Sequence, residues 1–566
     1  MGVIADIGFF ALLFLVLVFV HELGHFLMAK WMGIKVEKFS LGMGPKIFSF
    51  QKGDTEYRLA ALPLGGYVKM AGDDPSKEYS DAEKKIGFLT QKPPAKLLVV
   101  FGGPVFNLIL PIILFGIMLA VGIPSIAPVV GLLQEDLPAK VAGLKSGDRL
   151  IAVDGQKLLK WTDFEKIVQS SAGKPLQVEV ERLNTQSLKT ENVKFEVTPV
   201  LADAKSKFGE DIKVGRLGIS PEFVMPQIFF EDSKSALAEA GFKSLDRVRK
   251  INGSSILSQD QFLEILNAQK SAEISVLVER DSQNLELNLK VPQGNCKGDC
   301  SVATRVGLLS TLLVIGEVPN GRPAFKAGLQ TSDRLLSINS QKLKNWDDVL
   351  KLIKGSEGRA LEVAWSRGGK EMKAVVTPEL TEIKDPIMGK DSPTAKEPVY
   401  QIGIAPMALM DADYVTEQSW SPVDWLNRGL TQTWEMTSMT VIGLFKLVTG
   451  QLSLKALGSP IMIYKLAGNS YRMAGGGKHG WVSFLSLLAL LSITLGVINL
   501  FPIPVLDGGH AVFFTIEWIR GRPLSLKVME WAMQAGLFIL ICVFVVALYN
   551  DFSREGWLDP VFRLLR

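Results

Sequence analysis

Residues 18–30 read VFVHELGHFLMAK and place two histidines and a glutamate inside a stretch that is otherwise apolar. The run that precedes His21, IGFFALLFLVLVFV, carries no charge. A helix that crosses a bilayer needs about 20 largely apolar residues, and residues 4–29 meet this requirement. No basic segment precedes the run and no small-residue cleavage site follows it, so we expect a membrane span and not a cleaved signal peptide.

Further apolar stretches predict a polytopic α-helical membrane protein with about four transmembrane helices. Residues 97–122 and 531–549 are long and apolar enough to span, and residues 481–506 are uncharged but end among prolines, which predicts a helix broken near its end. Charged residues interrupt residues 425–449, so this piece is expected to be an amphipathic helix at the membrane interface.

The distribution of basic residues predicts the orientation in the membrane. The loop 30–96 is rich in lysine, which places it in the cytoplasm by the positive-inside rule. Residues 123–424 and both termini then lie outside. There, the two cysteines of NCKGDC, Cys296 and Cys300, can form a disulfide or remain free thiols.

The composition limits the classes of function. Hydrophobic residues make up 47% of the 566 residues, and the net charge is only +4. Because no basic tract with interleaved aromatic residues occurs, nucleic acid is not an expected partner. Three cysteines are too few for a cysteine-based zinc site.

The segment outside the membrane contains a threefold repeat. Residues 142–155 read AGLKSGDRLIAVDG, 240–253 read AGFKSLDRVRKING and 327–340 read AGLQTSDRLLSINS. An amphipathic helical pattern and alternating strands follow each copy. The repeat resembles PDZ domains of the bacterial type, which implies that peptide termini bind beside a sheet edge.

The organisation expected from these patterns has seven parts. They are the first two spans with a hairpin (1–122), three inserted extracytoplasmic α+β domains of PDZ type (123–200, 217–293 and 306–380), a linker (381–424), an interfacial helix region (425–480), and the last two spans (481–566).

His21, Glu22 and His25 have the spacing of a metal site on a helix. Residues four apart lie on one face about 6 Å apart along the axis, so both imidazoles can bind one metal ion. Glu22 flanks that face and suits a general base that acts on water. A carboxylate in the bilayer costs roughly 2.5–3.5 kcal/mol, and a zinc ion bound beside it gives a reason for that cost.

A catalytic zinc generally has three protein ligands, so a third ligand is needed. The stretch NLFPIPVLDGGH, residues 499–510, is the best candidate because it lies at the same end of a span that runs in the same direction. Asp507 and His510 can both ligate, and Gly508 and Gly509 allow close approach of the backbone.

Together these motifs resemble the site-2 protease family of intramembrane zinc metalloproteases, of the type that regulates the bacterial sigma E response. The resemblance extends to LGGYVKMAG (64–72) and FGGPVFN (101–107). It implies that His21, His25 and Asp507 bind zinc, that Glu22 activates water and that Asn499 contacts the substrate backbone. The choice of Asp507 over His510 rests on the resemblance alone.

The resemblance also implies the substrate and the location. The protein is expected in the cell inner membrane, with its PDZ domains in the periplasm and its active site toward the cytoplasm. Single-span membrane proteins, such as an anti-sigma factor trimmed by another protease, are the expected substrates, and remnant signal peptides are a second class. The PDZ domains would act as a size filter or docking platform.

Two departures from the family, and one open structural question, remain. The family type usually carries two PDZ domains where this chain has three, and residues 457–462 read LGSPIM where the family shows Ser-Gly-Pro-Ile. Residues 42–70 predict a hairpin around KGD that either enters the membrane, as in the family, or lies in the cytoplasm.

Two alternative functions follow from the same residues. A membrane-anchored PDZ adaptor would use the metal only for structure and would not need Glu22. A metal transporter would need further intramembrane ligands, and the second and fourth expected spans have none.

Overall fold

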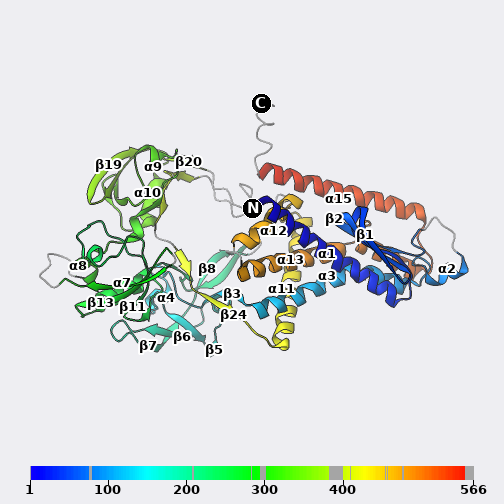
Figure 1. Ribbon diagram of the computed structural model, residues 1–566, viewed down its shortest axis with the longest axis horizontal. Helices are drawn as coiled ribbons and strands as arrows, with labels where there is room; N and C mark the ends of the chain where they lie inside the picture. Colours follow the sequence, from blue (N-terminus) through cyan, green and yellow to red (C-terminus); the bar gives the residue numbers. More distant parts are fainter. Residues whose placement is uncertain are drawn as a thin grey trace. The chain divides into compact units, whose positions relative to one another are not determined.

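The computed structural model describes residues 2–74, 80–206, 210–281, 283–292, 301–381, 399–407, 410–452, 454, 457–473 and 477–554. The chain forms two units: the two ends of the chain build a helical unit, and its middle, from Ser125 onward, builds a sheet-containing unit (Figure 1). Cys296, Cys300 and the whole polar stretch 382–398 lie outside the described residues, so the disulfide stays a prediction.

Four helices of the first unit are long and apolar enough to cross a membrane, as the sequence predicts. They are α1 (Gly2–Trp31), α3 (Pro93–Val121), α13 (Gly477–Asn499) and α15 (Leu526–Arg554). The third ends at Asn499, earlier than the expected boundary at residue 506, because Pro502 and Pro504 follow and cannot continue the hydrogen-bond ladder of the helix. A turn then leads into α14 (Asp507–Arg520).

Glycines allow α1 and α3 to pack at very short distance. A Cβ atom on Gly24 would lie 2.2 Å from the Gly102 carbonyl oxygen, and one on Gly102 would lie 2.6 Å from the Gly24 oxygen. The two helices therefore touch backbone to backbone at the level of the histidines. Farther along, Leu17, Phe115 and Leu488 belong to one buried cluster that joins α1, α3 and α13.

The region expected as one interfacial segment over 425–480 contains two helices, α11 (Pro422–Val448) and α12 (Pro460–Met473), and the start of α13. Gly116 and Gly429 allow α11 to cross closely over α3 (Figure 1). The outer side of α11 exposes apolar side chains such as Trp434 and Phe445. This amphipathic pattern fits an interfacial position.

The expected hairpin is formed by β1 (Val36–Lys52) and β2 (Thr55–Met70). Both strands bend, so residues 36–41 pair on one side with residues 66–70 and on the other side with residues 56–59. The hairpin packs against α1, and Phe26 and Phe39 form part of that contact.

The three repeats each fold into a four-stranded antiparallel sheet and one main helix. Repeat 1 has β4 (Arg149–Val153), β5 (Gln156–Lys157), α5 (Trp161–Ser170), β6 (Leu176–Leu183) and β7 (Thr190–Val197); repeat 2 has β11 (Arg247–Ile251), β12 (Ser254–Ser255), α7 (Gln259–Ala268), β13 (Glu273–Arg280) and β14 (Gln283–Lys290); repeat 3 has β16 (Arg334–Ile338), β17 (Gln341–Lys342), α10 (Trp346–Gly355), β18 (Leu361–Arg367) and β19 (Lys370–Val376).

Each repeat extends beyond the boundary expected from the sequence. A segment that follows the four strands, RLGI at 216–219, RVGL at 305–308 and QIGI at 401–404, contributes buried side chains to its own core, and its glycine has a positive φ in all three copies. The expected ends at residues 200, 293 and 380 miss this segment, because irregular or polar stretches separate it from the strands.

The expected linker over residues 381–424 is also shorter than predicted. Residues 399–417 contain four short strands, β21 (Val399–Gln401), β22 (Ala405–Pro406), β23 (Met410–Ala412) and β24 (Tyr414–Glu417). Ile402 and Met407 are buried there, which explains why the segment folds onto the repeats.

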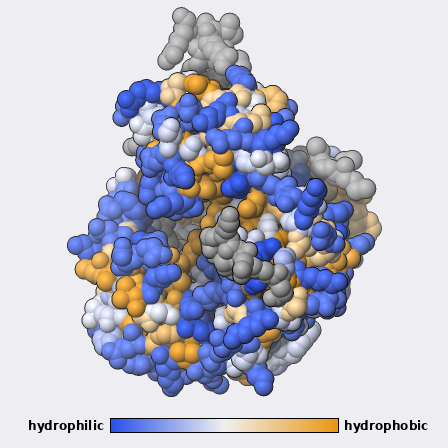
Figure 2. Space-filling view, turned by 90° about the vertical axis from the view of Figure 1, so that its left-hand side faces the viewer, coloured by the Kyte–Doolittle hydropathy of each residue, from blue (hydrophilic) through white to orange (hydrophobic). Residues whose placement is uncertain are grey.

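The remaining elements are short. The helical ones are α2 (Asp81–Ile86), α4 (Pro138–Val141), α6 (Ala236–Glu239), α8 (Val302–Val306), α9 (Pro323–Lys326) and a 3-10 turn at Thr311–Leu313; the strands are β3 (Ile123–Ile126), β8 (Val200–Lys205), β9 (Asp211–Arg216), β10 (Glu222–Val224), β15 (Ile315–Glu317) and β20 (Glu379–Thr381). Figure 2 looks onto the side where the repeats lie, and most of the surface in view is hydrophilic.

The aspartate of the repeated motif has the same buried ion pair in every copy. Asp148 pairs with Arg182, Asp246 with Arg280 and Asp333 with Arg367, and each arginine also donates to a glycine carbonyl of the motif. The hydrogen bond to Asp148 raises the pKa of Arg182. The repeated aspartate therefore fixes the turn of the motif to the neighbouring strand of its sheet, β6, β13 or β18.

Replacing Asp246 by alanine is expected to destabilise repeat 2 by about 1–3 kcal/mol, because it removes the hydrogen-bond acceptor of the half-buried Arg280 and of the Lys243 backbone N–H. The Asp246 side chain is only 1% exposed. Hydrogen–deuterium exchange on the full chain should show faster exchange in β11, β13 and β14. The exposed Glu273, replaced by alanine, is the control, and equal exchange in both variants would contradict the expectation.

Candidate metal centre

Three side chains from two distant segments meet at one point in the helical unit. His21 Nε2 lies 3.2 Å from Asp507 Oδ2, His25 Nε2 lies 3.6 Å from the same oxygen, and the two Nε2 atoms are 3.2 Å apart. Among the described residues, this is the one group of three or more histidine, cysteine, aspartate or glutamate side chains within metal-binding distance of one another. All three side chains are largely buried.

Local structure explains how each ligand reaches this point. His21 and His25 are one helical turn apart on α1, so their rings lie on one face. Asp507 is the first residue of α14, directly after the turn that ends α13. Gly508 and Gly509 permit this turn, because Cβ atoms there would lie 2.3 Å from the backbone oxygens of Phe501 and Ile503.

The distances fit a zinc ion. Tetrahedral zinc with bonds of about 2.0–2.1 Å places its ligand atoms about 3.3 Å apart, and the three atoms here are 3.2–3.6 Å apart. Gly103 of α3 keeps the space beside them open, since a Cβ atom there would lie 2.4 Å from His25 Nε2 and 2.8 Å from His21 Cε1. In the stretch FGGPVFN, Gly102 therefore permits the close contact between α1 and α3, and Gly103 leaves room for the metal site.

The other nitrogen of each ring is also held. His25 Nδ1 donates to the Val99 carbonyl oxygen at 2.8 Å, and His21 Nδ1 lies 3.1 Å from the side-chain amide of Asn107. With the Asn107 nitrogen turned toward the ring, the buried Oδ1 has no hydrogen-bond partner within the described part of the chain. If His21 Nε2 binds a metal, the proton of the ring is on Nδ1, which becomes a hydrogen-bond donor. Rotating the Asn107 side-chain amide by 180° then places its oxygen, Oδ1, where it accepts this hydrogen bond.

Asn107 is a functional residue that the sequence analysis did not identify. It is fully buried on α3, and Ser492 of α13 donates to its backbone oxygen at 2.7 Å. An asparagine in an apolar span, four residues after Gly103, was the available signal. Its amide orients His21, as outer partners of metal-bound histidines do.

Replacing Asn107 by leucine is expected to lower zinc affinity about 10- to 100-fold, because His21 loses the acceptor that fixes its ring. Asn107→Asp keeps an acceptor oxygen and should restore part of the affinity. Competition with a chromogenic chelator measures both variants. If Asn107→Leu binds zinc as tightly as the wild type does, the orienting role is wrong.

His21 Nε2, His25 Nε2 and Asp507 Oδ2 form a triangle of ligand atoms. Glu22 lies beside this triangle and is not part of it. It is within electrostatic range of His25, His21 and Asp507. The strand β2 passes directly over it: a Cβ atom on Gly66 would lie 3.0 Å from Glu22 Cγ and 2.8 Å from Val18 Cγ1. The hairpin therefore forms one wall of the space in front of Glu22.

The other two candidate residues lie outside the triangle. His510, left open as a ligand by the sequence, instead stacks on Phe514 and lines a neighbouring cavity. Asn499 is the last residue of α13 and is half-buried, so its role toward substrate stays a prediction.

Comparison with known proteins identifies relatives of the whole chain. The family model described as peptidase family M50 matches residues 9–543. The regulator of sigma E protease of Haemophilus influenzae is 28% identical and aligns with 98% of this chain and 100% of its own length. The regulator of sigma-E protease RseP of Escherichia coli is 27% identical over 97% and 98% of the two chains.

Two further matches extend this list. A protein of Neisseria meningitidis named as a zinc metalloprotease is 28% identical over 95% of this chain and 97% of its own. A solved PDZ domain protein of Parabacteroides distasonis covers 52% of the chain at 10% identity, with a TM-score of 0.14, which is too low to support an argument.

Proposed function

The chain belongs to peptidase family M50 and is a zinc metalloendopeptidase of the membrane, and we propose that His21, His25 and Asp507 bind its catalytic zinc while Glu22 is the general base. The triangle of ligand atoms beside a glutamate within apolar helices is the observation that carries this assignment. Family membership decides in favour of a peptidase over the adaptor and the transporter.

The residues of the chain define a mechanism for hydrolysis of a peptide bond. A bound zinc ion supplies a Lewis acid that polarises the scissile carbonyl and lowers the pKa of water. Glu22 accepts a proton from the attacking water and gives it to the leaving amine nitrogen as the carbon–nitrogen bond breaks. Asn107 and the Val99 carbonyl hold the two imidazoles in place during these steps.

We propose that the substrate lies as an extended strand beside β2. Residues 66–70 pair on one edge with residues 36–41, and within the described residues no strand pairs with their other edge. An added strand would satisfy its backbone hydrogen bonds there and would pass over Glu22 at Gly66. A transmembrane substrate must therefore unwind near the scissile bond, and Asn499 is a further candidate for holding its backbone.

The substrates that fit this arrangement are single-span membrane proteins. The sigma E regulators among the relatives support an anti-sigma factor as the substrate and the cell inner membrane as the location. The lysine-rich loop 30–96 supports an active site toward the cytoplasm and periplasmic repeats. Exposed Ile47, Phe48 and Phe50 on the hairpin suit contact with lipid.

The repeats are proposed to bind peptide termini and to limit access of untrimmed substrates. Repeat 1 has a cavity of about 300 Å³ between α5 and residues 217–221, next to the positive-φ Gly218. PDZ domains bind a peptide by adding it as a strand to an exposed sheet edge, and we propose that the peptide terminus enters this cavity.

Removal of zinc tests the proposed function. Treating the purified protein with a chelator is expected to abolish cleavage of a single-span substrate in proteoliposomes, and added Zn²⁺ should restore it. Magnesium serves as the control, because octahedral oxygen coordination does not suit two imidazoles. Undiminished cleavage in the metal-free protein would rule out a catalytic zinc.

A further inference from the structure

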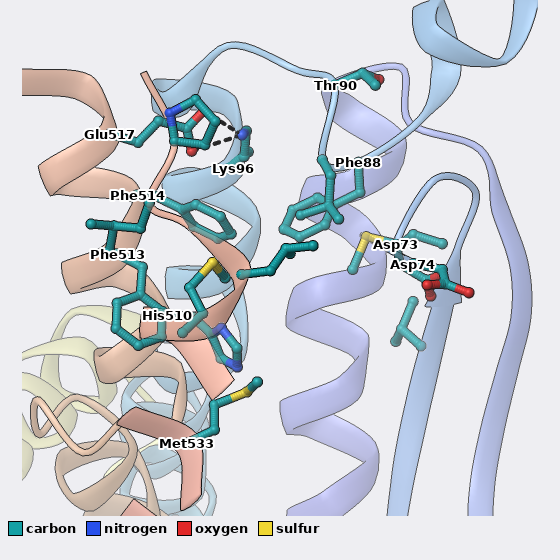
Figure 3. A pocket seen from close by; sticks show the side chains of 17 residues that line it. Asp73, Asp74, Phe88, Thr90, Lys96, His510, Phe513, Phe514, Glu517 and Met533 are labelled. Carbon is teal, nitrogen blue, oxygen red and sulfur yellow. Dashed lines mark hydrogen bonds and ion pairs between the residues drawn. The ribbon is translucent and has the colours of Figure 1, made fainter. Parts of the chain in front are cut away.

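A cavity of about 570 Å³ lies next to the metal centre, within the helical unit. Its walls come from β2, residues 88–90, the first turn of α3, α14 and the first turns of α15, and they include Val68, Met70, Phe513, Phe514, Met529 and Met533. Figure 3 shows Phe513, Phe514 and His510 on one side and the end of β2 with Asp73 and Asp74 on the other.

The cavity continues the line of the proposed substrate strand. Gly66 lies against Glu22, and Val68 and Met70 line the cavity two and four residues later. Along a strand these positions are about 7 and 13 Å from Gly66, and they face the same side. His510, one turn after Asp507 on α14, forms the wall nearest the metal ligands.

The lining is mainly apolar, and its charged side chains are Asp73 and Asp74 at the end beyond β2 and the pair Lys96 and Glu517. Lys96 Nζ is hydrogen-bonded to both carboxylate oxygens of Glu517, at 2.7 and 2.9 Å, and the Lys96 side chain is only 3% exposed. Lys96 also lies over the Phe514 ring. Because this ion pair is already satisfied, it gives a charged ligand little to bind, whereas aromatic and thioether side chains provide a large apolar surface.

We propose that this cavity is a specificity pocket for large apolar side chains of the substrate, located two to four residues from the scissile bond on the side of Met70. The proposal rests on the proposed function, because it takes the strand beside β2 as substrate. Since side chains alternate along a strand, one or two alternate substrate positions enter the pocket. Leucine or phenylalanine at these positions is preferred over alanine.

The test combines a pocket variant with a substrate series. A single-span substrate is cleaved in proteoliposomes, its scissile bond is located by mass spectrometry, and each flanking position is changed to alanine, leucine or phenylalanine. The wild type is expected to prefer the large residues about tenfold or more in kcat/KM at one or two alternate positions. Met533→Trp, which fills the pocket, should abolish or invert this preference.

Val528→Trp provides the matched control, because Val528 lies on the same helix, is 53% exposed and does not line the cavity. Its substrate profile should equal that of the wild type. The inference is overturned if Met533→Trp keeps the wild-type profile, or lowers kcat/KM equally for all substrates, as a pocket filled by lipid would. Absence of cleavage by the wild type would instead refute the proposed function, so the two failures are distinguishable.

Discussion

Replacing Glu22 by glutamine is expected to lower the rate of peptide-bond hydrolysis by at least about 10²–10⁴-fold while the purified protein retains its zinc. The amide cannot accept a proton from water, but it has nearly the same shape as the carboxylate and leaves His21, His25 and Asp507 untouched. The measurement pairs zinc content per chain with cleavage of a single-span substrate.

The same change should not harm the fold. A carboxylate inside a membrane span costs roughly 2.5–3.5 kcal/mol, so Glu22→Gln should leave the protein as stable as the wild type or slightly more stable. Glu530→Gln, at an exposed position of α15, is the matched control and should cleave normally. A Glu22→Gln protein that cleaves at the wild-type rate would remove the general base from the mechanism.

Replacing Asp507 by asparagine is expected to lower zinc affinity by more than about 100-fold, beyond the 10- to 100-fold effect of losing an outer partner, and to abolish cleavage. The carboxylate oxygen is the one acidic ligand atom of the three, and its replacement by an amide leaves only the two imidazoles as strong ligands. Because metal binding is coupled to folding, α14 should also become more mobile against α1.

The variant His510→Gln tests whether His510 binds the metal ion or only lies near it. His510 lies one turn from Asp507 but lines the cavity, so this variant should keep its zinc. The zinc content of Asp507→Asn and of His510→Gln is measured by atomic absorption after competition with a chelator. Loss of zinc from His510→Gln, with retention in Asp507→Asn, would exchange the roles of the two residues.

Hydropathy and length were sufficient to predict four long apolar helices, because a membrane helix is a continuous apolar run. That His21 and His25 lie together on one face could be predicted from spacing alone, since helix geometry fixes which side chains share a face. The choice between Asp507 and His510 as the third ligand could not be made from the spacing. The direction of each side chain depends on how the turn at residues 500–506 folds back against Gly508 and Gly509.

Features that arise from packing between distant segments could not be predicted from the sequence either. Asn107 meets His21 only because Gly24 and Gly102 bring α1 and α3 into backbone contact. The last segment of each repeat begins near Leu217 in the first copy. It is too short, and too far along the chain from the strands of its sheet, to be recognised from the alternation of apolar and polar residues. The cavity is built by β2, residues 88–90, α3, α14 and α15 together, and no local pattern predicts it.

X-ray absorption at the zinc edge of the intact protein tests the central claim most directly. The account predicts two imidazole nitrogens and one or two oxygens at about 2.0–2.2 Å, from His21, His25, Asp507 and water. A third imidazole, or a sulfur ligand at about 2.3 Å, would contradict it.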